Sequence, residues 1–167
     1  MKNIYLKGVL ALFLSCLSVG FFLSFINSKT KPVIENKKIE NVIESLQEVL
    51  PDAKRDDLTV LEKSDLPTTV SGIYKDNASG DFAVTLETSS SYSKSPLLFT
   101  VGISADGTIK KIVLVNYAET RDVGQKFLES FVGKDESLSG VDTVAGVTYS
   151  STTIKNAVLD AYTAVKE

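Results

Sequence analysis

Hydrophobic positions change their spacing several times along this chain, and each spacing predicts a different element. Residues 8–26 carry no charge. A helix of that length spans about 28 Å, which is enough to cross a bilayer core. We therefore predict an uncleaved transmembrane anchor over 8–26. A cleaved signal peptide is the alternative, but its apolar region covers only about 7–15 residues, and this one continues through Phe25.

Three further segments have the spacing of an amphipathic helix. In residues 35–50 the apolar side chains recur every three or four positions, acidic side chains lie between them, and Pro51 follows. The same spacing is present over 123–131 and again over 150–165. Each segment is predicted to be a helix that packs one face on a core.

The middle of the chain is rich in residues that favour strands. Turn residues separate the runs of Val, Ile, Leu, Phe and Thr. The predicted strands are Val70–Lys75, Phe82–Glu87, Pro96–Ser104 and Thr108–Asn116. Asp106-Gly107 predicts a hairpin between the last two, Asn77–Gly80 predicts another turn, and residues 89–95 read as a polar loop.

These elements predict an α+β protein, in which an N-terminal transmembrane helix precedes one domain with a twisted, mainly antiparallel sheet packed by helices. Residues 1–28 form the tip and the anchor, residues 29–54 the amphipathic helix and a linker, and residues 55–167 the domain. Lys2 and Lys7 precede the anchor while Lys29, Lys31, Lys37 and Lys38 follow it, so the lysine count alone leans against an extracytoplasmic domain.

The composition excludes several classes of function. The chain has no histidine and one cysteine, Cys16, which excludes a Ser-His-Asp triad, a His-ligated haem and an iron–sulfur cluster held by this chain. Residues 29–167 hold 16 basic and 21 acidic residues, a net charge of −5, which argues against a nucleic-acid partner. Any redox chemistry would therefore need an organic cofactor.

The best candidate for chemistry is the stretch from Asp142 to Ser151, where a small apolar segment ends in Gly146-Val147-Thr148 and a helical pattern follows. Thr148 would lie at a helix N-terminus, whose free N–H groups and partial positive charge suit a phosphate. Ser150 and Ser151 add hydroxyl donors. The alternative is an ordinary turn with a helix cap.

This stretch resembles the flavinylation motif of the FMN-binding domain family, Asp-x-x-Ser-Gly-Ala-Thr-x-Ser/Thr. In that family the last Thr carries FMN through a phosphoester bond made by a flavin transferase. The resemblance implies that Thr148 carries the flavin, that Gly146, Val147, Ser150 and Ser151 contribute to the site, and that the transferase reads Asp142. Ala145 and Val147 replace the usual Ser and Ala.

A second segment, Tyr117 to Gly124, resembles the family's His-x-Glu-Thr-Pro-Gly-x-Gly turn beside the flavin. Glu119, Thr120 and Gly124 match, whereas Tyr117, Arg121 and Asp122 replace the His, Pro and Gly. The resemblance implies that Thr120 and its neighbours hydrogen-bond the flavin ring. The alternative is that Glu119 and Thr120 cap the next helix.

Residues 46–53 resemble the helix after the anchor in the G subunit of the Rnf complex, an ion-translocating ferredoxin:NAD⁺ oxidoreductase. The resemblance implies an extracytoplasmic electron carrier with the N-terminus in the cytoplasm and with membrane subunits as partners. It implies no catalytic side chain and no metal in the mature domain. A stand-alone flavin carrier, a C-subunit-like part of the sodium-pumping NADH:quinone oxidoreductase and an anchored non-redox interaction domain stay open.

Overall fold

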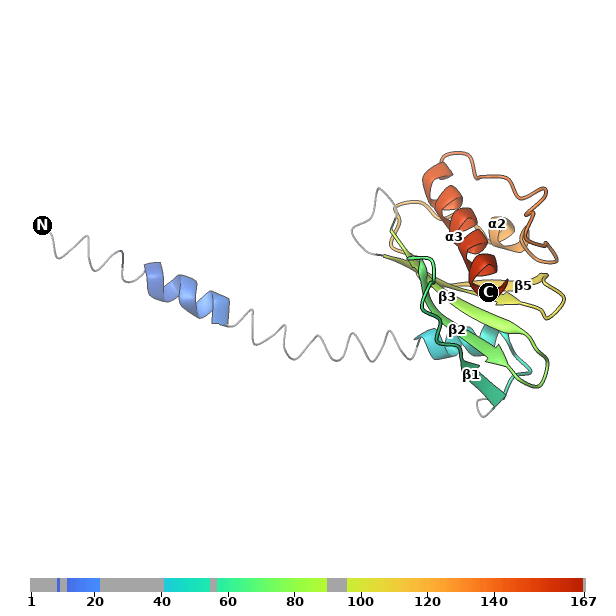
Figure 1. Ribbon diagram of the computed structural model, residues 1–167. Helices are drawn as coiled ribbons and strands as arrows, with labels where there is room; N and C mark the ends of the chain where they lie inside the picture. The colour runs from blue at the N-terminus through green and yellow to red at the C-terminus, as the bar shows by residue number, and fades with distance from the viewer. Residues whose placement is uncertain (1–8, 10–11, 22–40, 55–56, 90–95, 167) are drawn as a thin grey trace, which may run out of the picture. The chain divides into compact units, whose positions relative to one another are not determined.

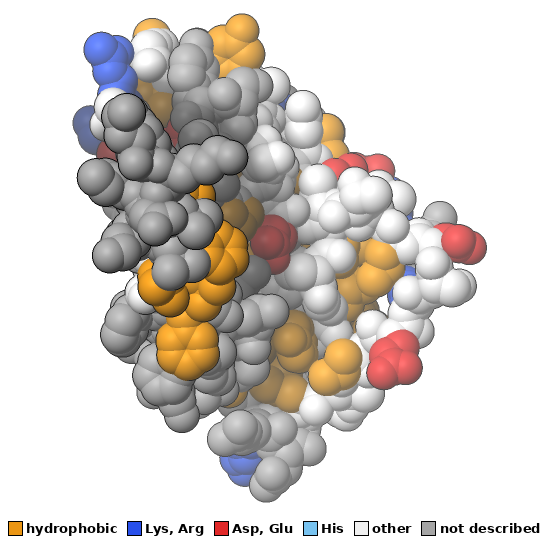
Figure 2. All heavy atoms as spheres, turned by 90° about the vertical axis from the view of Figure 1, so that its left-hand side faces the viewer, with side chains coloured by type: hydrophobic (Ala, Val, Ile, Leu, Met, Phe, Trp, Pro, Cys, Tyr) orange, Lys and Arg blue, Asp and Glu red, His pale blue; other side chains and the backbone are white. Residues whose placement is uncertain are grey.

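The computed structural model describes residues 9, 12–21, 41–54, 57–89 and 96–166. The chain divides into two compact units, Met1–Glu40 and Asn41–Glu167. In the first unit residues 12–21 are helical and their large apolar side chains are exposed; Figure 2 draws hydrophobic side chains in orange. Two serines of this helix donate hydrogen bonds to carbonyl oxygens of the preceding turn: Ser15 to Leu12 and Ser18 to Leu14, both at 2.8 Å.

Within the described residues no helix combines the length and the apolar character needed to cross a membrane. The predicted anchor over 8–26 lies partly outside those residues, as does the start of the predicted helix over 35–50. Most of the predicted loop over 89–95 lies outside them as well.

A five-stranded antiparallel sheet organises the second unit, with its strands side by side in chain order (Figure 1). The strands are β1 (Leu58–Val60), β2 (Val70–Asp76), β3 (Phe82–Thr88), β4 (Leu97–Ile103) and β5 (Ile109–Asn116). Each strand pairs with the strand that precedes it in the chain, so the sheet forms from neighbouring segments. The predicted α+β class with an antiparallel sheet is confirmed.

The four predicted strands correspond to β2 through β5. Both predicted turns are also present: Gly80 N–H donates to the Asp76 carbonyl and Gly107 N–H to the Ser104 carbonyl, each at 2.8 Å. A further strand, β1, was not predicted from the sequence; it pairs with β2 at the edge of the sheet. Three residues with mostly exposed side chains are too few to show a period of two.

One face of the sheet packs on the last helix, α3 (Thr148–Lys166). Alternate strand residues such as Ile73, Phe99 and Val101 are fully buried there against Ile154 and Val158. Figure 1 shows α3 lying across this face, with the short helix α2 (Gln125–Glu129) beside it. The period-two and period-3.6 patterns therefore meet in one core.

The opposite face of the sheet is covered by the helix over residues 41–49, whose Leu46 and Val49 are buried. The contact is close, because a Cβ added at Gly102 would come within 3.0 Å of both the Cβ and the carbonyl oxygen of Val49. A buried hydrogen bond of 2.7 Å joins the hydroxyls of Ser45 and Thr100 across it. The predicted packing role of this helix is confirmed, and it lies within the compact unit that begins at Asn41.

The predicted helix over 123–131 is shorter than expected. It begins after Gly124, whose φ of 83° is outside the helical range, and Ser130 is its C-terminal cap residue. Phe127 and Phe131 still meet edge to face with ring centroids 5.1 Å apart. Both rings are buried in the core, which confirms the packing role predicted for this segment.

Candidate functional site

A cavity lies where the chain leaves β5 and where α3 begins. Its volume is about 350 Å³, and it is lined by two segments, residues 119–121 and residues 146–150. Sites for small molecules enclose roughly 300–1,000 Å³. The cavity therefore brings together the two segments that the sequence analysis selected, which are 25 residues or more apart in the chain.

The second segment is a turn that ends as α3 starts. Val147 N–H donates to the Val144 carbonyl at 3.0 Å, and Gly146 has a φ of 79°, a conformation that costs glycine little. Thr148 is the first residue of α3 and is exposed. Its hydroxyl is 3.5 Å from the Val144 carbonyl, at the outer limit of a hydrogen bond. The Thr148 hydroxyl is therefore accessible and weakly held at the positive end of a long helix.

Buried serines hold this turn in place. Ser151 is fully buried, and its hydroxyl accepts a hydrogen bond from Val144 N–H at 3.1 Å while it lies 3.0 Å from the Val147 carbonyl. Ser150 is also buried, and its hydroxyl lowers the pKa of Tyr117. The Ser151 hydroxyl thus fixes the backbone from which the Thr148 side chain projects.

The first segment is held by Tyr117, which follows the last residue of β5. The Tyr117 hydroxyl donates a 2.6 Å hydrogen bond to the Arg121 carbonyl. Burial raises the pKa of Tyr117, and the negative charges of Glu119 and Asp122 raise it further, although the hydrogen bond with Ser150 opposes them. Tyr117 therefore stays a neutral donor at physiological pH and closes the turn over residues 117–121.

The capping alternative for Glu119 and Thr120 is wrong. The N-cap residue of α2 is Gly124, and no side chain makes a cap hydrogen bond there. Asp122 instead accepts a 3.0 Å hydrogen bond from Gly124 N–H within the turn. Glu119 and Thr120 instead line the cavity.

Most of the residues selected from sequence line the same cavity. These are Glu119, Thr120, Gly146, Val147, Thr148 and Ser150. Two others do not: Ser151 is buried behind the turn, and Asp142 is exposed outside the lining.

The cavity also contains two side chains that the sequence analysis did not select. Tyr149 presents an aromatic ring that is 60% exposed. Arg121 lines the other wall and was noticed only as a departure from the family pattern. The sequence could have indicated Arg121 as a phosphate-binding residue, because a guanidinium group pairs well with phosphate oxygens and Arg121 belongs to the second motif.

Comparison with known families gives this geometry a context. Residues 93–163 match the FMN-binding domain family. The matched range contains β4, β5, α2 and every residue that lines the cavity, and it ends within α3. No curated protein matched the chain.

The residues that line the cavity fit FMN on structural grounds. An accessible hydroxyl, the N-terminus of a 19-residue helix and a guanidinium group meet at one cavity, and such groups suit a phosphate. The side chains of Val147 and Tyr149 add apolar and aromatic surface, which suits a planar ring. The match and the geometry together indicate a flavin-binding electron-transfer protein.

Proposed function

We propose that this chain is an electron carrier with FMN attached through a phosphoester bond to Thr148. The observation that supports this most is the position of the Thr148 hydroxyl, which is exposed at the first residue of α3 in a cavity shared with residues 119–121. The hydroxyl is accessible to a flavin transferase, and the phosphate would lie at the positive end of the helix.

Each part of the cavity has a role in this proposal. Ser151 and the positive φ of Gly146 hold the turn so that Thr148 projects outward. Glu119, Thr120 and Val147 would contact the flavin together with the backbone around them. Bound FMN would accept two electrons and release them one at a time, while the protein positions it. Asp142, exposed outside the cavity, would be part of what the transferase recognises.

We further propose the cellular setting that the resemblances imply. Residues 8–26 anchor the protein, the N-terminus is cytoplasmic, and the flavin domain is extracytoplasmic. The protein is a subunit of an Rnf-type complex, in which ferredoxin and NAD⁺ redox chemistry is coupled to Na⁺ or H⁺ translocation. Support for this assignment comes from residues 46–53, and the partners are the other membrane subunits.

The flavin proposal is tested by the intact mass of the full chain purified from membranes of cells that contain the flavin transferase. We expect the mass to increase by one FMN less one water, with the modification located on the peptide that contains Thr148, and we expect ultraviolet fluorescence of the band in a denaturing gel. Thr148→Ala should abolish both signals. Thr152→Ala is the matched control, because Thr152 is exposed one turn further along α3 and does not line the cavity. A wild-type mass equal to the amino acids alone would refute the proposal.

The setting needs a separate measurement. Mild detergent extraction of the native membrane, followed by purification through a tag on this chain, should recover the other subunits of a ferredoxin- and NAD⁺-linked complex. Recovery of the flavinylated chain without those subunits would contradict the Rnf assignment and favour a stand-alone carrier.

A further inference from the structure

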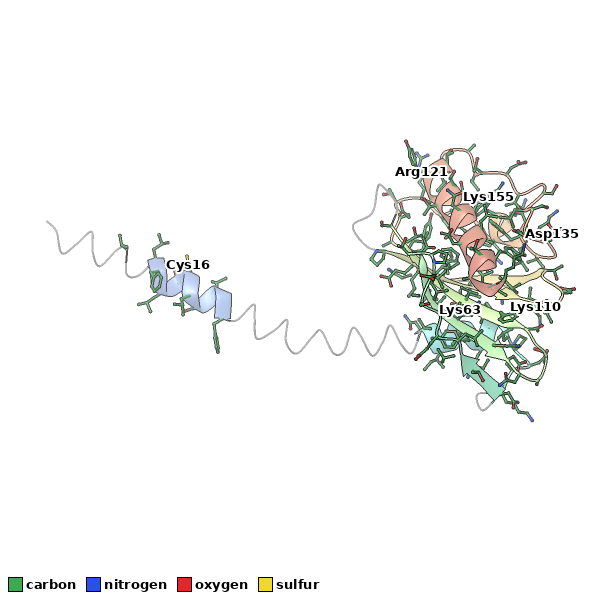
Figure 3. All side chains as sticks on the ribbon, in the orientation of Figure 1. Cys16, Lys63, Lys110, Arg121, Asp135 and Lys155 are labelled. Atoms are coloured by element: carbon green, nitrogen blue, oxygen red, sulfur yellow. The ribbon has the colours of Figure 1, made fainter. Side chains whose placement is uncertain are left out.

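Arg121 lines the cavity opposite the turn that carries Thr148. The guanidinium is close to that turn, since a Cβ added at Gly146 would lie 3.1 Å from the Arg121 Nη1 atom. Figure 3 shows Arg121 beside the N-terminal end of α3. Arg121 is the only lysine or arginine among the residues that line this cavity.

The backbone of Arg121 is fixed while its charge is available. The Tyr117 hydroxyl binds the Arg121 carbonyl at 2.6 Å, so the residue has a defined position. In the described parts of the chain the ion pairs join Lys110 to Asp81, Lys111 to Glu48 and Lys166 to Glu136, and none includes Arg121. Its side chain is exposed at the cavity. A guanidinium held in this way is ready to pair with an anion that enters the cavity.

We propose that Arg121 is the positioning residue for the cofactor phosphate, an inference that rests on the proposed attachment at Thr148. In the attachment step the Thr148 oxygen forms a new P–O bond to the phosphorus of a flavin nucleotide that the transferase supplies in phosphoanhydride form. The anhydride bond breaks, its nucleotide leaving group takes the hydroxyl proton, and the phosphodiester that remains on Thr148 keeps one negative charge. The planar guanidinium can donate two parallel hydrogen bonds to its oxygens. Gly146 makes room for this pairing, because any side chain at that position would meet the guanidinium. Arg121 thereby fixes the phosphate end of the flavin in this chain.

The test compares Arg121→Gln, Arg121→Lys and the control Lys126→Gln in full chains co-produced with the flavin transferase. Lys126 is exposed on α2 and lies outside the cavity lining, so its replacement removes one positive charge without touching the site. The readouts are the fraction of chain modified during a short induction, from intact mass, and the ³¹P NMR resonance of the attached phosphodiester.

We expect Arg121→Gln to slow modification about tenfold, the size of a lost charge-assisted hydrogen bond. The ³¹P resonance of the chain that is modified should move away from the wild-type position. The modification rate of Arg121→Lys should lie between those of the wild type and Arg121→Gln, because an ammonium group keeps the positive charge but cannot donate two parallel hydrogen bonds. Lys126→Gln should match the wild type in both readouts.

Wild-type rate and resonance in Arg121→Gln would overturn the role of Arg121 while leaving the flavin proposal intact. A wild-type chain without flavin would overturn both. If Arg121→Gln stays unmodified, its circular dichroism and its thermal midpoint decide the outcome. A folded variant supports the inference, and an unfolded variant contradicts it by giving Arg121 a structural role.

Discussion

Two cations at opposite ends of β5 show how the structure treats charge differently at a structural site and at a binding site. Lys110, the second residue of β5, is 2.7 Å from Asp81, which is buried and also accepts a 3.0 Å hydrogen bond from Ala105 N–H. Arg121, beyond the other end of β5, faces a cavity and makes no ion pair in the described parts of the chain. Figure 3 labels both side chains.

The end that contains Lys110 satisfies its polar groups internally. Asp76 accepts hydrogen bonds from the Ser79 hydroxyl at 2.6 Å and from Ala78 N–H at 3.1 Å, so the β2–β3 turn closes on itself. At the cavity, the Thr148 hydroxyl and the guanidinium of Arg121 point to a shared space. Internal pairing stabilises the fold, and groups left for an external partner provide binding.

The largest effect on stability should come from removing Asp81, the buried acceptor at the end of β5 that contains Lys110. Asp81→Ala removes a buried acceptor and leaves Lys110 and Ala105 N–H without it, so we expect a loss of about 2–3 kcal/mol in the free energy of unfolding. Glu48→Ala removes an equally short ion pair, the one between Glu48 and Lys111. Both of these side chains are about half exposed. That control should cost less than about 0.5 kcal/mol. Equal losses in urea denaturation would contradict the contrast.

Lowering the pH should remove the stabilising contribution of the Asp81 carboxylate without a mutation. The Ser79 hydroxyl and the Ala78 N–H lower the pKa of Asp76. Burial raises the pKa of Asp81, but its hydrogen bonds with Lys110 and Ala105 outweigh burial and the net pKa is lowered. A carboxyl with a lowered folded pKa stabilises the protein above its unfolded pKa, here 3.8, and this contribution is lost as the pH falls below that value.

The measurement is the urea midpoint of the wild type and of Asp81→Ala between pH 7 and pH 2.5. The gap between the two proteins should be constant above about pH 5 and should shrink below pH 3.8. A gap that is independent of pH would show that the carboxylate charge contributes nothing to stability.

A smaller effect on stability is expected at the cavity, beyond the other end of β5. Gly146→Ala places a side chain at a φ of 79° and at 3.1 Å from Arg121 Nη1, so it should cost about 1–2 kcal/mol and slow flavin attachment. Gly107→Ala is the matched control, since Gly107 has a φ of 85° and nothing within 4 Å of the added Cβ. The control should lose similar stability in urea and keep the wild-type rate of attachment. If flavin attachment were slowed equally in both variants, the slowing would reflect lost stability and not a change at the cavity.

The smallest effect on stability is expected from replacing Arg121, in contrast to the ion pair between Lys110 and Asp81. Arg121→Gln in the unmodified chain should change the free energy of unfolding by less than about 0.5 kcal/mol, because its side chain is exposed and makes no ion pair in the described residues. Thermal and urea unfolding of the chain purified without the transferase measure it. A loss comparable to that of Asp81→Ala would make Arg121 a structural residue.

Local pattern alone determined much of this protein. Runs of strand-favouring residues between turn residues located β2 through β5, Asp106-Gly107 located a hairpin, and a period of 3.6 located α3 to within two residues of its start at Thr148. These features depend on neighbouring residues, so they can be read from short windows of sequence. The edge strand β1 and the true length of α2 were not readable in this way, because three mostly exposed residues and one glycine conformation leave no period.

Only the tertiary structure decided which residues share the cavity. The chain between α2 and α3 folds back with Leu138 and Val141 in the core, and Lys155 of α3 donates a 2.6 Å hydrogen bond to the Val141 carbonyl. This packing brings residues 119–121 to residues 146–150 and places Arg121 beside Gly146. Contacts across such a distance arise from the burial of a common core, and no local periodicity specifies them.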